Sequence, residues 1–274
     1  MLTFIPTPLG NLKDITLRAL NAFDESEILL CEDTRVTKRL LYLLKEEGLL
    51  RCELSSKSFL SFHTHNQEEF LTKLESNPNF FDANIVYSVD AGMPCISDPG
   101  ARLIRYAIAN KVPFEVLPGS SALTLSYALS GLESSFKFIG FLPSTQKARL
   151  EALKILSGIN ILYESPKRIL ELMRDIESTF SDSKVYAYKE LTKLHFKSFC
   201  GTPSEVLDLM KKANLNGEWC VVLDIKQATK FITIDEKELL ELRLPLKDKA
   251  KLLAKLRGTS PKECYAFLES KKES

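Results

Sequence analysis

Short runs of β-forming residues alternate with helix-like stretches through the first half of this chain, and no other feature restricts its fold as strongly. The β-like runs are LTFIP (2–6), EILLC (27–31), FLSFH (59–63), NIVYSV (84–89) and PFEVLP (113–118). The helix-like stretches between them are TLRALNAF (16–23), RVTKRLLYLLKEEG (35–48), NQEEFLTKLE (66–75) and ARLIRYAIAN (101–110). Because the β-like runs are apolar without strict alternation, the pattern predicts a parallel sheet covered by helices on both faces.

A second α/β pattern begins near Gly119. Its β-like runs are FKFIGFL (136–142), NILYES (160–165), KVYAYKE (184–190), LHFKSFC (194–200) and EWCVVLDI (218–225). Only three residues separate the third run from the fourth, which is too short for a helical crossover, so these two runs should form an antiparallel hairpin in a mixed sheet. We therefore predict an α/β protein with two domains, residues 1–118 and 119–230, and a ligand cleft between them.

Residues 231–274 form a Lys-rich third segment with a helical pattern. Interruptions at Pro245 and at GTSP (258–261) predict two short helices with a turn between them. Such a pair either contacts nucleic acid, as helix-turn-helix units do, or packs on a domain, and the sequence leaves both open.

The composition is that of a globular protein, with 45% hydrophobic and 27% charged residues in 274. The formal charge of +1 indicates no global basic field. No signal peptide and no long apolar run is visible, which predicts a cytoplasmic protein that does not enter the membrane. The six cysteines lie far apart, so we expect reduced thiols, mostly buried, with disulfides or a zinc cluster as the alternative.

Several common ligand motifs are absent. The glycines never fall as G-x-G, and neither the phosphate-binding P-loop pattern nor H-E-x-x-H occurs. His63 and His65 lie two apart in FHTHN and would share one face of a strand, which could seed a metal site. No cysteine or third histidine lies near them, so we expect polar residues facing a cleft and no metal.

Four polar loops follow the first, second, fourth and fifth β-like runs. They are TPLGN (7–11), CEDTR (31–35), DAGMPCISDPG (90–100) and LPGSSA (117–122). Loops after parallel strands open on one edge of the sheet, where such sheets bind ligands. Turn and cap chemistry alone would also explain each loop. Together, however, their carboxylates and small residues favour a site for a ligand with an amino group, a carboxylate and a nucleoside.

Eight segments, in order from residue 5 to about residue 225, also resemble one family. They are FIPTPLGNLKDITLRAL, CEDTR, FHTHN, DAGMPCISDPG, LPGSSALTLSYALSGL, GFLP, YESPKR and KELTKL. The chain resembles the bacterial 16S rRNA (cytidine-2′-O)-methyltransferases of the tetrapyrrole-methylase-like, class III S-adenosylmethionine-dependent superfamily. The resemblance implies a homodimer that binds S-adenosylmethionine between its domains. The implied substrate is a cytidine ribose 2′-hydroxyl at the decoding site of 16S rRNA in the small ribosomal subunit.

The resemblance and the loop positions together suggest roles for individual residues. The implied cofactor contacts are Pro8, Asp90, Ala91, Gly92, Ile96, Asp98, Gly119, Ser120, Ser121, Phe141 and Leu142. Candidates for the group that accepts the hydroxyl proton are Glu32, Asp33, His65 and Glu190, and Arg35, Asn66 and Lys193 are expected to contact the substrate. Glu32 and Asp33 could instead cap the following helix, and the sequence does not choose among the four.

Two other functions remain open. A small-molecule methyltransferase of the same superfamily would need a wide apolar trough for a tetrapyrrole, and a non-catalytic RNA- or ribosome-binding protein would not need the acidic loops. An RNA substrate requires a local basic track on this nearly neutral chain. Candidate clusters are Arg35, Lys38 and Arg39; Lys147 and Arg149; Lys167 and Arg168; and Lys247 to Arg257.

Overall fold

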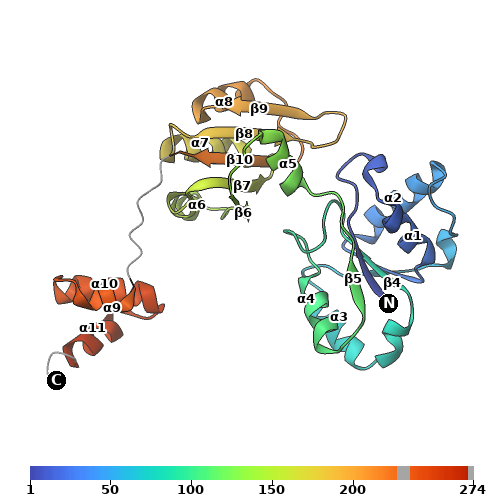
Figure 1. Cartoon of the computed structure of the whole chain (residues 1–274), viewed down its shortest axis with the longest axis horizontal. Coiled ribbons are helices and arrows are strands. Elements are labelled where there is room, and N and C mark those ends of the chain that lie inside the picture. The colour runs from blue at the N-terminus through green and yellow to red at the C-terminus, as the bar shows by residue number, and fades with distance from the viewer. Residues whose placement is uncertain (227–234, 271–274) are drawn as a thin grey trace. The chain divides into compact units, whose positions relative to one another are not determined.

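The computed structural model describes residues 1–226 and 235–270 and consists of two compact units, Met1–Gln227 and Ala228–Ser274. The described part of the first unit contains two separate five-stranded sheets, each with helices packed on it (Figure 1). The predicted two α/β sheets followed by a helical segment are therefore confirmed. The exact domain boundaries after residues 118 and 230 stay predictions, because both sheets belong to one compact unit.

The first sheet is entirely parallel, as predicted. Its order is β3-β2-β4-β1-β5, built from β1 (Leu2–Ile5), β2 (Ile28–Cys31), β3 (Ser58–Ser61), β4 (Ile85–Ser88) and β5 (Phe114–Val116). One face carries α1 (Leu17–Glu25) and α2 (Thr34–Glu46), and the other carries α3 (Gln67–Glu75) and α4 (Ala101–Ala109) (Figure 1). Short 3-10 helices, η1 (Leu12–Asp14), η2 (Leu54–Ser56) and η3 (Pro78–Asp82), lie in the connections.

The helices stay on this sheet because both sheet faces are apolar. Leu29 and Cys31 of β2 point into the core under α1 and α2, while Leu30 between them points into the core under α3 and α4. Burial on both faces explains why the strands read as continuous apolar runs. Since all five strands run in one direction, the four polar loops meet at one edge, as predicted.

The second sheet is mixed, in the order β6-β7-β10-β8-β9. Its strands are β6 (Phe136–Phe141), β7 (Gly158–Glu164), β8 (Lys184–Lys189), β9 (Lys197–Gly201) and β10 (Trp219–Ile225). Only β6 and β7 run parallel, and β8 and β9 form the predicted antiparallel hairpin. α5 (Ala122–Ser130) packs on one face, and α6 (Gln146–Lys154), α7 (Ile169–Thr179) and α8 (Pro203–Lys211) pack on the other.

One member of the suspected basic track belongs to the core instead. The Arg149 side chain is only 1% exposed, and its Nε donates to Asp175 Oδ2 over 2.7 Å. Arg149 also donates to the Ser144 carbonyl and to Glu171 on α7. Because these acceptors satisfy the buried guanidinium, Arg149 joins α6 to α7 and is not available to RNA.

The second unit contains three helices among its described residues, where two were predicted. They are α9 (Glu236–Glu241), α10 (Leu246–Arg257) and α11 (Pro261–Ser270). The prediction counted too few because a short helix, α9, precedes Pro245, which is the N-cap of α10, while the left-handed Gly258 ends α10. Leu239, Leu253 and Leu268 bring one side chain from each helix into a small separate core.

All six cysteines are free. Cys31, Cys220 and Cys264 are buried, as expected, but Cys200 on β9 is exposed. No helix among residues 1–226 and 235–270 is long and apolar enough to cross a membrane.

Candidate active site

The loops after β1 and β4 are joined at the edge of the first sheet. The Thr7 N–H donates to the Gly92 carbonyl over 2.9 Å, and the Gly92 N–H donates back to the Thr7 carbonyl over 3.0 Å. The Thr7 hydroxyl also donates to the Val89 carbonyl. Gly92 has φ +84°, and a Cβ there would lie 3.1 Å from Leu9 Cδ2. Glycine therefore lets the two loops approach each other.

The DAGMPCISDPG loop has an unusual backbone for its residue types. Cys95 and Ser97 have φ of 68° and 65°, in the left-handed region that side chains with a Cβ disfavour. Gly100 has φ +125°, and a Cβ on it would lie 2.8 Å from Tyr87 Cε1 and 2.9 Å from Cys95 Sγ. The loop is thus held in a tight, strained shape directly over the end of β4. Backbone strain of this kind is concentrated at functional sites.

Three carboxylates meet where this loop passes the end of β2. The Asp33 N–H donates to Asp90 Oδ1 over 3.2 Å, and the Asp90 N–H lies 3.4 Å from Glu32 Oε2. Burial, followed by the charge of Asp90, raises the pKa of Glu32 even though the Asp90 N–H opposes it. Burial also raises the pKa of Asp90. The predicted proximity of the second and fourth loops is therefore present in the structure.

Asp33 differs from its neighbours because its oxygens are occupied. Its Oδ1 accepts the Arg35 N–H over 2.8 Å, so Asp33 caps α2, and its Oδ2 accepts from the Arg35 guanidinium over 2.6 Å. These bonds lower the pKa of Asp33 to about 2. A carboxylate with such a low pKa is a weak proton acceptor at neutral pH.

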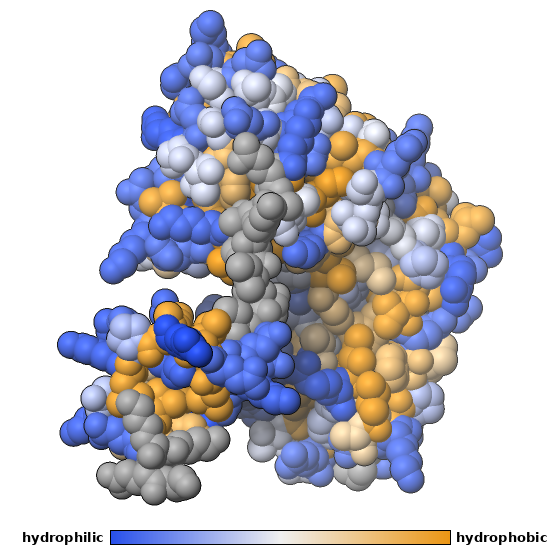
Figure 2. All heavy atoms as spheres, turned by 60° about the vertical axis from the view of Figure 1, so that its left-hand side comes forward, coloured by the Kyte–Doolittle hydropathy of each residue, from blue (hydrophilic) through white to orange (hydrophobic). Residues whose placement is uncertain are grey.

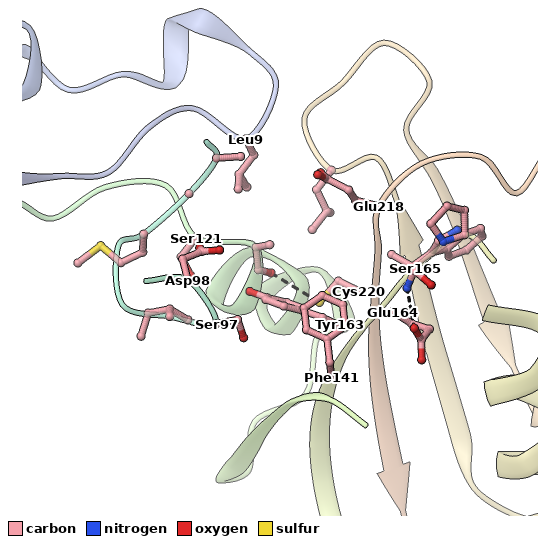
Figure 3. Close-up of a pocket in the computed structure, with 18 residues that line it drawn as sticks. Leu9, Ser97, Asp98, Ser121, Phe141, Tyr163, Glu164, Ser165, Glu218 and Cys220 are labelled. Atoms are coloured by element: carbon pink, nitrogen blue, oxygen red, sulfur yellow. Dashed lines mark hydrogen bonds between the residues drawn. The ribbon is translucent and has the colours of Figure 1, made fainter. Parts of the chain in front are cut away.

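A cavity of about 310 Å³ opens between the loops of the first sheet and the edge of the second. The space-filling view shows a recess with apolar side chains inside it (Figure 2). The close-up shows Leu9, Asp98 and Ser121 on one side and Tyr163, Glu164 and Glu218 on the other (Figure 3). The lining residues are Leu9, Ala91, Gly92, Met93, Ile96, Ser97, Asp98, Ser121, Ala122, Phe141, Tyr163, Glu164, Ser165, Pro166, Leu191, Glu218, Trp219 and Cys220.

Strand pairing in the second sheet brings its wall together. β7 ends at the cavity, and β10 runs antiparallel to it and so begins there, with Trp219 opposite Glu164. β8 also ends there, with Lys189 opposite Trp219. The pairing therefore places the ends of three strands that are separated in sequence side by side at the cavity.

Asp98 is the cavity carboxylate that has no bonding partner. Its side chain makes no hydrogen bond or ion pair with any residue that the structure describes, unlike the other two acids of the wall. Burial, then the charges of Glu32, Asp90 and Glu218, raise the pKa of Asp98 to about 7. The group is therefore half-ionised near neutral pH, as an efficient proton acceptor should be.

Glu164 is the most deeply buried acid of the wall. Its Oε1 accepts from the Ser165 N–H and from the Arg168 guanidinium, both over 2.7 Å, while its Oε2 is buried without a partner. Arg168 Nη1 also donates to the Leu142 carbonyl. A buried acceptor without a partner is costly unless a ligand or water completes it. Glu164 thus keeps one unsatisfied acceptor oxygen buried in the wall of the cavity.

The rim of the cavity contains a second group of charges. Lys193 Nζ lies 3.0 Å from Glu190 Oε1 and 3.0 Å from Glu218 Oε2. Burial would raise the pKa of Glu190, but the Glu218 N–H and Lys193 outweigh it and lower the pKa. A Cβ on Gly10 would lie 2.2 Å from Lys193 Cγ. The glycine of the first loop therefore leaves space for the lysine stem of the second sheet.

The structure places the predicted site residues in the lining of the cavity, beside it or away from it. Ala91, Gly92, Ile96, Asp98, Ser121 and Phe141 line the cavity. Glu32, Asp33, Arg35 and Asp90 lie at the sheet edge beside it, Glu190 and Lys193 lie at its rim, and Pro8, Gly119 and Ser120 belong to the adjoining loops. Leu142, His65 and Asn66 do not line it: Leu142 is buried in the core of the second sheet.

The two histidines do not lie in a strand as expected, because β3 ends at Ser61. His63 and His65 occupy the following turn, where the His65 N–H donates to His63 Nδ1 over 3.2 Å. Asn66 holds this turn by accepting from the His63 N–H and donating to the Ser61 carbonyl. Within the described residues, no group of three His, Cys, Asp or Glu side chains is arranged to hold a metal ion.

Most of the residues that the second sheet contributes to the cavity lining were not predicted from the sequence. Tyr163, Glu164 and Ser165 stand in the YESPKR segment, at the end of an apolar β-like run, which was a usable signal. Trp219 and Cys220 stand at the start of a run, so only the antiparallel pairing reveals that they reach the same edge.

Comparison with known proteins gives consistent results. The family model described as "Tetrapyrrole (Corrin/Porphyrin) Methylases" matches residues 1–207. A protein named ribosomal RNA small subunit methyltransferase I from Helicobacter pylori (strain J99) is 42% identical over 290 residues, covering 100% of this chain and 99% of that protein. A protein of the same name from Thermotoga maritima is 38% identical, covering 82% of this chain and 99% of its own length.

Solved structures agree on the fold. A cobalt precorrin-4 methyltransferase matches with a TM-score of 0.58 and 16% identity, covering 81% of this chain and 94% of that one. A uroporphyrin-III C-methyltransferase from Thermus thermophilus, crystallised with S-adenosyl homocysteine, matches with a TM-score of 0.54 and 16% identity, covering 81% and 96%. Identities this low show a shared fold alone.

Proposed function

Because this chain belongs to the tetrapyrrole methylase family, and within it to the ribosomal RNA small subunit methyltransferase I proteins, we propose that it methylates a cytidine ribose 2′-hydroxyl in 16S rRNA. The chain is an S-adenosylmethionine-dependent methyltransferase acting on ribosomal RNA. The finer proposal is that the target lies at the decoding site of the small subunit and that the enzyme works as a homodimer in the cytoplasm, without a metal.

The cavity fits the cofactor. Its walls combine apolar and aromatic side chains, such as Phe141 and Tyr163, with the small residues Ala91 and Gly92. Such a surface suits an adenosine. S-adenosylmethionine supplies a methyl group that is activated by its sulfonium. The observation that carries the proposal is that one cavity contains both this apolar surface and a free carboxylate, Asp98.

The reaction requires alignment and a proton acceptor. The new bond joins the methyl carbon to the ribose oxygen, the carbon–sulfur bond breaks with its electrons left on sulfur, and the hydroxyl proton goes to the protein. Holding the reactants in line within a shaped cavity can contribute about 7–11 kcal/mol to the barrier reduction. The strained loop and the second wall provide that shape.

We propose Asp98 as the proton acceptor, in addition to the contact with the cofactor expected for it. Among the acids that line the cavity, Glu164 is bonded to Arg168, and Glu218 is largely exposed and paired with Lys193. The four candidates taken from loop position lie outside the lining, and two of them, Asp33 and Glu190, have a lowered pKa. Asp98 alone combines location, freedom from partners and a pKa near 7.

Methylation of small ribosomal subunits tests the function. Subunits purified from a strain that lacks this protein should accept one labelled methyl group from S-adenosylmethionine, and mapping should place the label on the ribose of a cytidine. Subunits from the parent strain, already methylated, are the matched control and should accept none. Label on a base, or labelling of a tetrapyrrole in place of the subunits, would refute the proposal.

A further inference from the structure

A basic hollow lies on the first unit, away from the cavity. Lys38, Arg39 and Tyr42 of α2 form one side of it, and Leu54, Ser55 and Phe59 form the other. Its volume is about 590 Å³. Lys57 contributes its stem to the lining, while its ammonium is buried on the Ser26 and Asp24 carbonyls. None of the described residues that line the hollow is acidic.

The two outer cations are available to a ligand. Lys38 Nζ lies 4.8 Å from the centre of the Phe59 ring, and neither Lys38 nor Arg39 makes a hydrogen bond or ion pair with a residue in the described part of the chain. The Tyr42 side chain is exposed, and its hydroxyl bonds to Glu46 one turn further along α2. The ring is therefore accessible on the helix surface.

These residues form a path that begins at the active site. Positions 35, 38, 39 and 42 recur at the three- and four-residue spacing that places side chains on one face of a helix. The first turn of α2 is tied to the cavity loop, because the Asp33 N–H donates to Asp90, next to Ala91. At 1.5 Å per residue, Arg35 to Tyr42 covers about 10 Å of axis. The acidic residue of this helix, Glu46, and the residue after it, Glu47, stand at its far end.

We propose that this face of α2 and its hollow bind the single-stranded RNA that flanks the target nucleotide. Lys38 and Arg39, which form no ion pair with the described residues, and the exposed Tyr42 ring match how proteins hold a single strand, with phosphates on the cations and a base stacked on a ring. The proposal rests on the proposed function, because the strand it binds is the strand whose ribose reaches Asp98. It adds the place where the substrate is held and the residues that hold it.

The test compares two double variants that each remove two adjacent positive charges. Lys38→Ala with Arg39→Ala alters the hollow, and Lys211→Ala with Lys212→Ala alters the exposed end of α8 as the matched control. The substrate is unmethylated small subunits. The hollow variant should raise the apparent KM and reduce its logarithmic salt slope by roughly 1.4, or about 0.7 per lost phosphate contact. Its kcat and its calorimetric affinity for S-adenosylmethionine should match those of the wild type.

A second pair of variants, at Tyr42, distinguishes base stacking from charge. Tyr42→Ala should raise the apparent KM by about tenfold with an unchanged salt slope, since base stacking is not ionic. Tyr42→Phe retains the ring and should behave as the wild type.

Each other outcome has a distinct meaning. If the hollow variant and the α8 control raise the apparent KM and reduce its salt slope equally, the proposal is overturned in favour of a nonspecific effect of charge. Unaltered KM and salt slope in a hollow variant whose sedimentation changes would assign this face to contact between copies of the chain. Wild-type enzyme that leaves subunits unmethylated would instead refute the proposed function itself.

Discussion

At the scale of single residues, burial distinguishes acids that look alike in the sequence. Asp33 and Asp98 both stand in polar loops at the same sheet edge. Asp33 accepts hydrogen bonds from the N–H and the guanidinium of Arg35, and these bonds hold its pKa at about 2. Asp98 is half-buried beside other acids, which raises its pKa to about 7. The same functional group is therefore a permanent anion in one position and a proton acceptor in the other.

Asp98→Asn should abolish the pH dependence assigned to this residue. Because its pKa is raised, the wild-type carboxylate is protonated below about pH 7 and ionised above it, so kcat should rise through pH 7 and then level. The amide cannot accept the proton, and kcat should fall about 10²- to 10⁴-fold with no such rise. Single-turnover rates from pH 5 to 9 measure both effects.

Asp33→Asn provides the contrast. With its pKa at about 2, Asp33 stays ionised throughout that pH range, so its loss should leave the rise through pH 7 in place. If Asp98→Asn keeps the wild-type pH profile and only binds S-adenosylmethionine more weakly, Asp98 is a cofactor contact and not the proton acceptor.

At the scale of elements, the loop after β4 is held in shape by what lies beneath it. Tyr87 is fully buried at the end of β4, and the Gly100 backbone rests against its ring. Leu9 of the neighbouring loop packs against Gly92. Such close backbone approaches hold Ala91 to Asp98 in place, and a rigid, preorganised loop loses less entropy on binding.

Gly100→Ala should damage this loop more than a comparable glycine change elsewhere. The added methyl would clash with Tyr87 and Cys95 and also disfavour φ +125°. Gly131→Ala at the end of α5 is the control, since its φ is +65° but nothing lies within 4 Å of its Cβ. We expect Gly100→Ala to lower the free energy of unfolding by about 1–3 kcal/mol more than the control. Urea unfolding measures this difference.

The same two variants should differ in cofactor binding. Gly100→Ala shifts the loop that contains Gly92 and Asp98 and should weaken calorimetric binding of S-adenosylmethionine, while Gly131→Ala should not. Equal stability and equal affinity of the two variants would contradict the account of the loop given above.

At the scale of the whole molecule, the second unit is a separately folded helical element. Its core contains Leu239, Leu253 and Leu268, and Asp235 and Glu238 form a capping box that begins α9. Several of its cations are already engaged: Lys249 donates to the Leu240 carbonyl, and Arg257 pairs with Glu236. Lys247 and Lys255 make no hydrogen bond or ion pair with the described residues, so they are among the cations of this unit that are open to an outside partner.

Deleting residues 235–274 should raise the apparent KM for small subunits and flatten its salt dependence. If Lys247 and Lys255 each contact a phosphate, the logarithmic slope should fall by roughly 1.4–1.8. Affinity for S-adenosylmethionine should stay the same, because the lining of the cavity belongs to the first unit. Sedimentation and thermal unfolding of the truncated protein test the alternative that this unit is a packing or dimer element. A folded, dimeric truncated protein with an unaltered salt slope would rule out contact with RNA.

The sequence by itself determined the elements and one half of the site. Apolar runs and helical spacing are local patterns, so they predicted the parallel sheet, the β8–β9 hairpin and the four loops on one edge. The predicted number of helices in the last segment was too low although both interruptions were recognised. The six-residue helix α9 was missed because its sequence is short, and its Leu239 is buried only by the other two helices.

Tertiary structure decided what those elements bring together. Trp219 and Glu164 face the cavity because β10 pairs antiparallel with β7, and no local pattern encodes that register. The sequence suggested that Arg149 is a surface cation, yet its side chain is buried and paired with Asp175 from another helix. The pKa of Asp98 likewise depends on Glu32 and Asp90, which lie far away in the chain. Local periodicity depends on neighbours in sequence, whereas burial, pairing and charge state depend on neighbours in space, and only the folded chain brings those neighbours together.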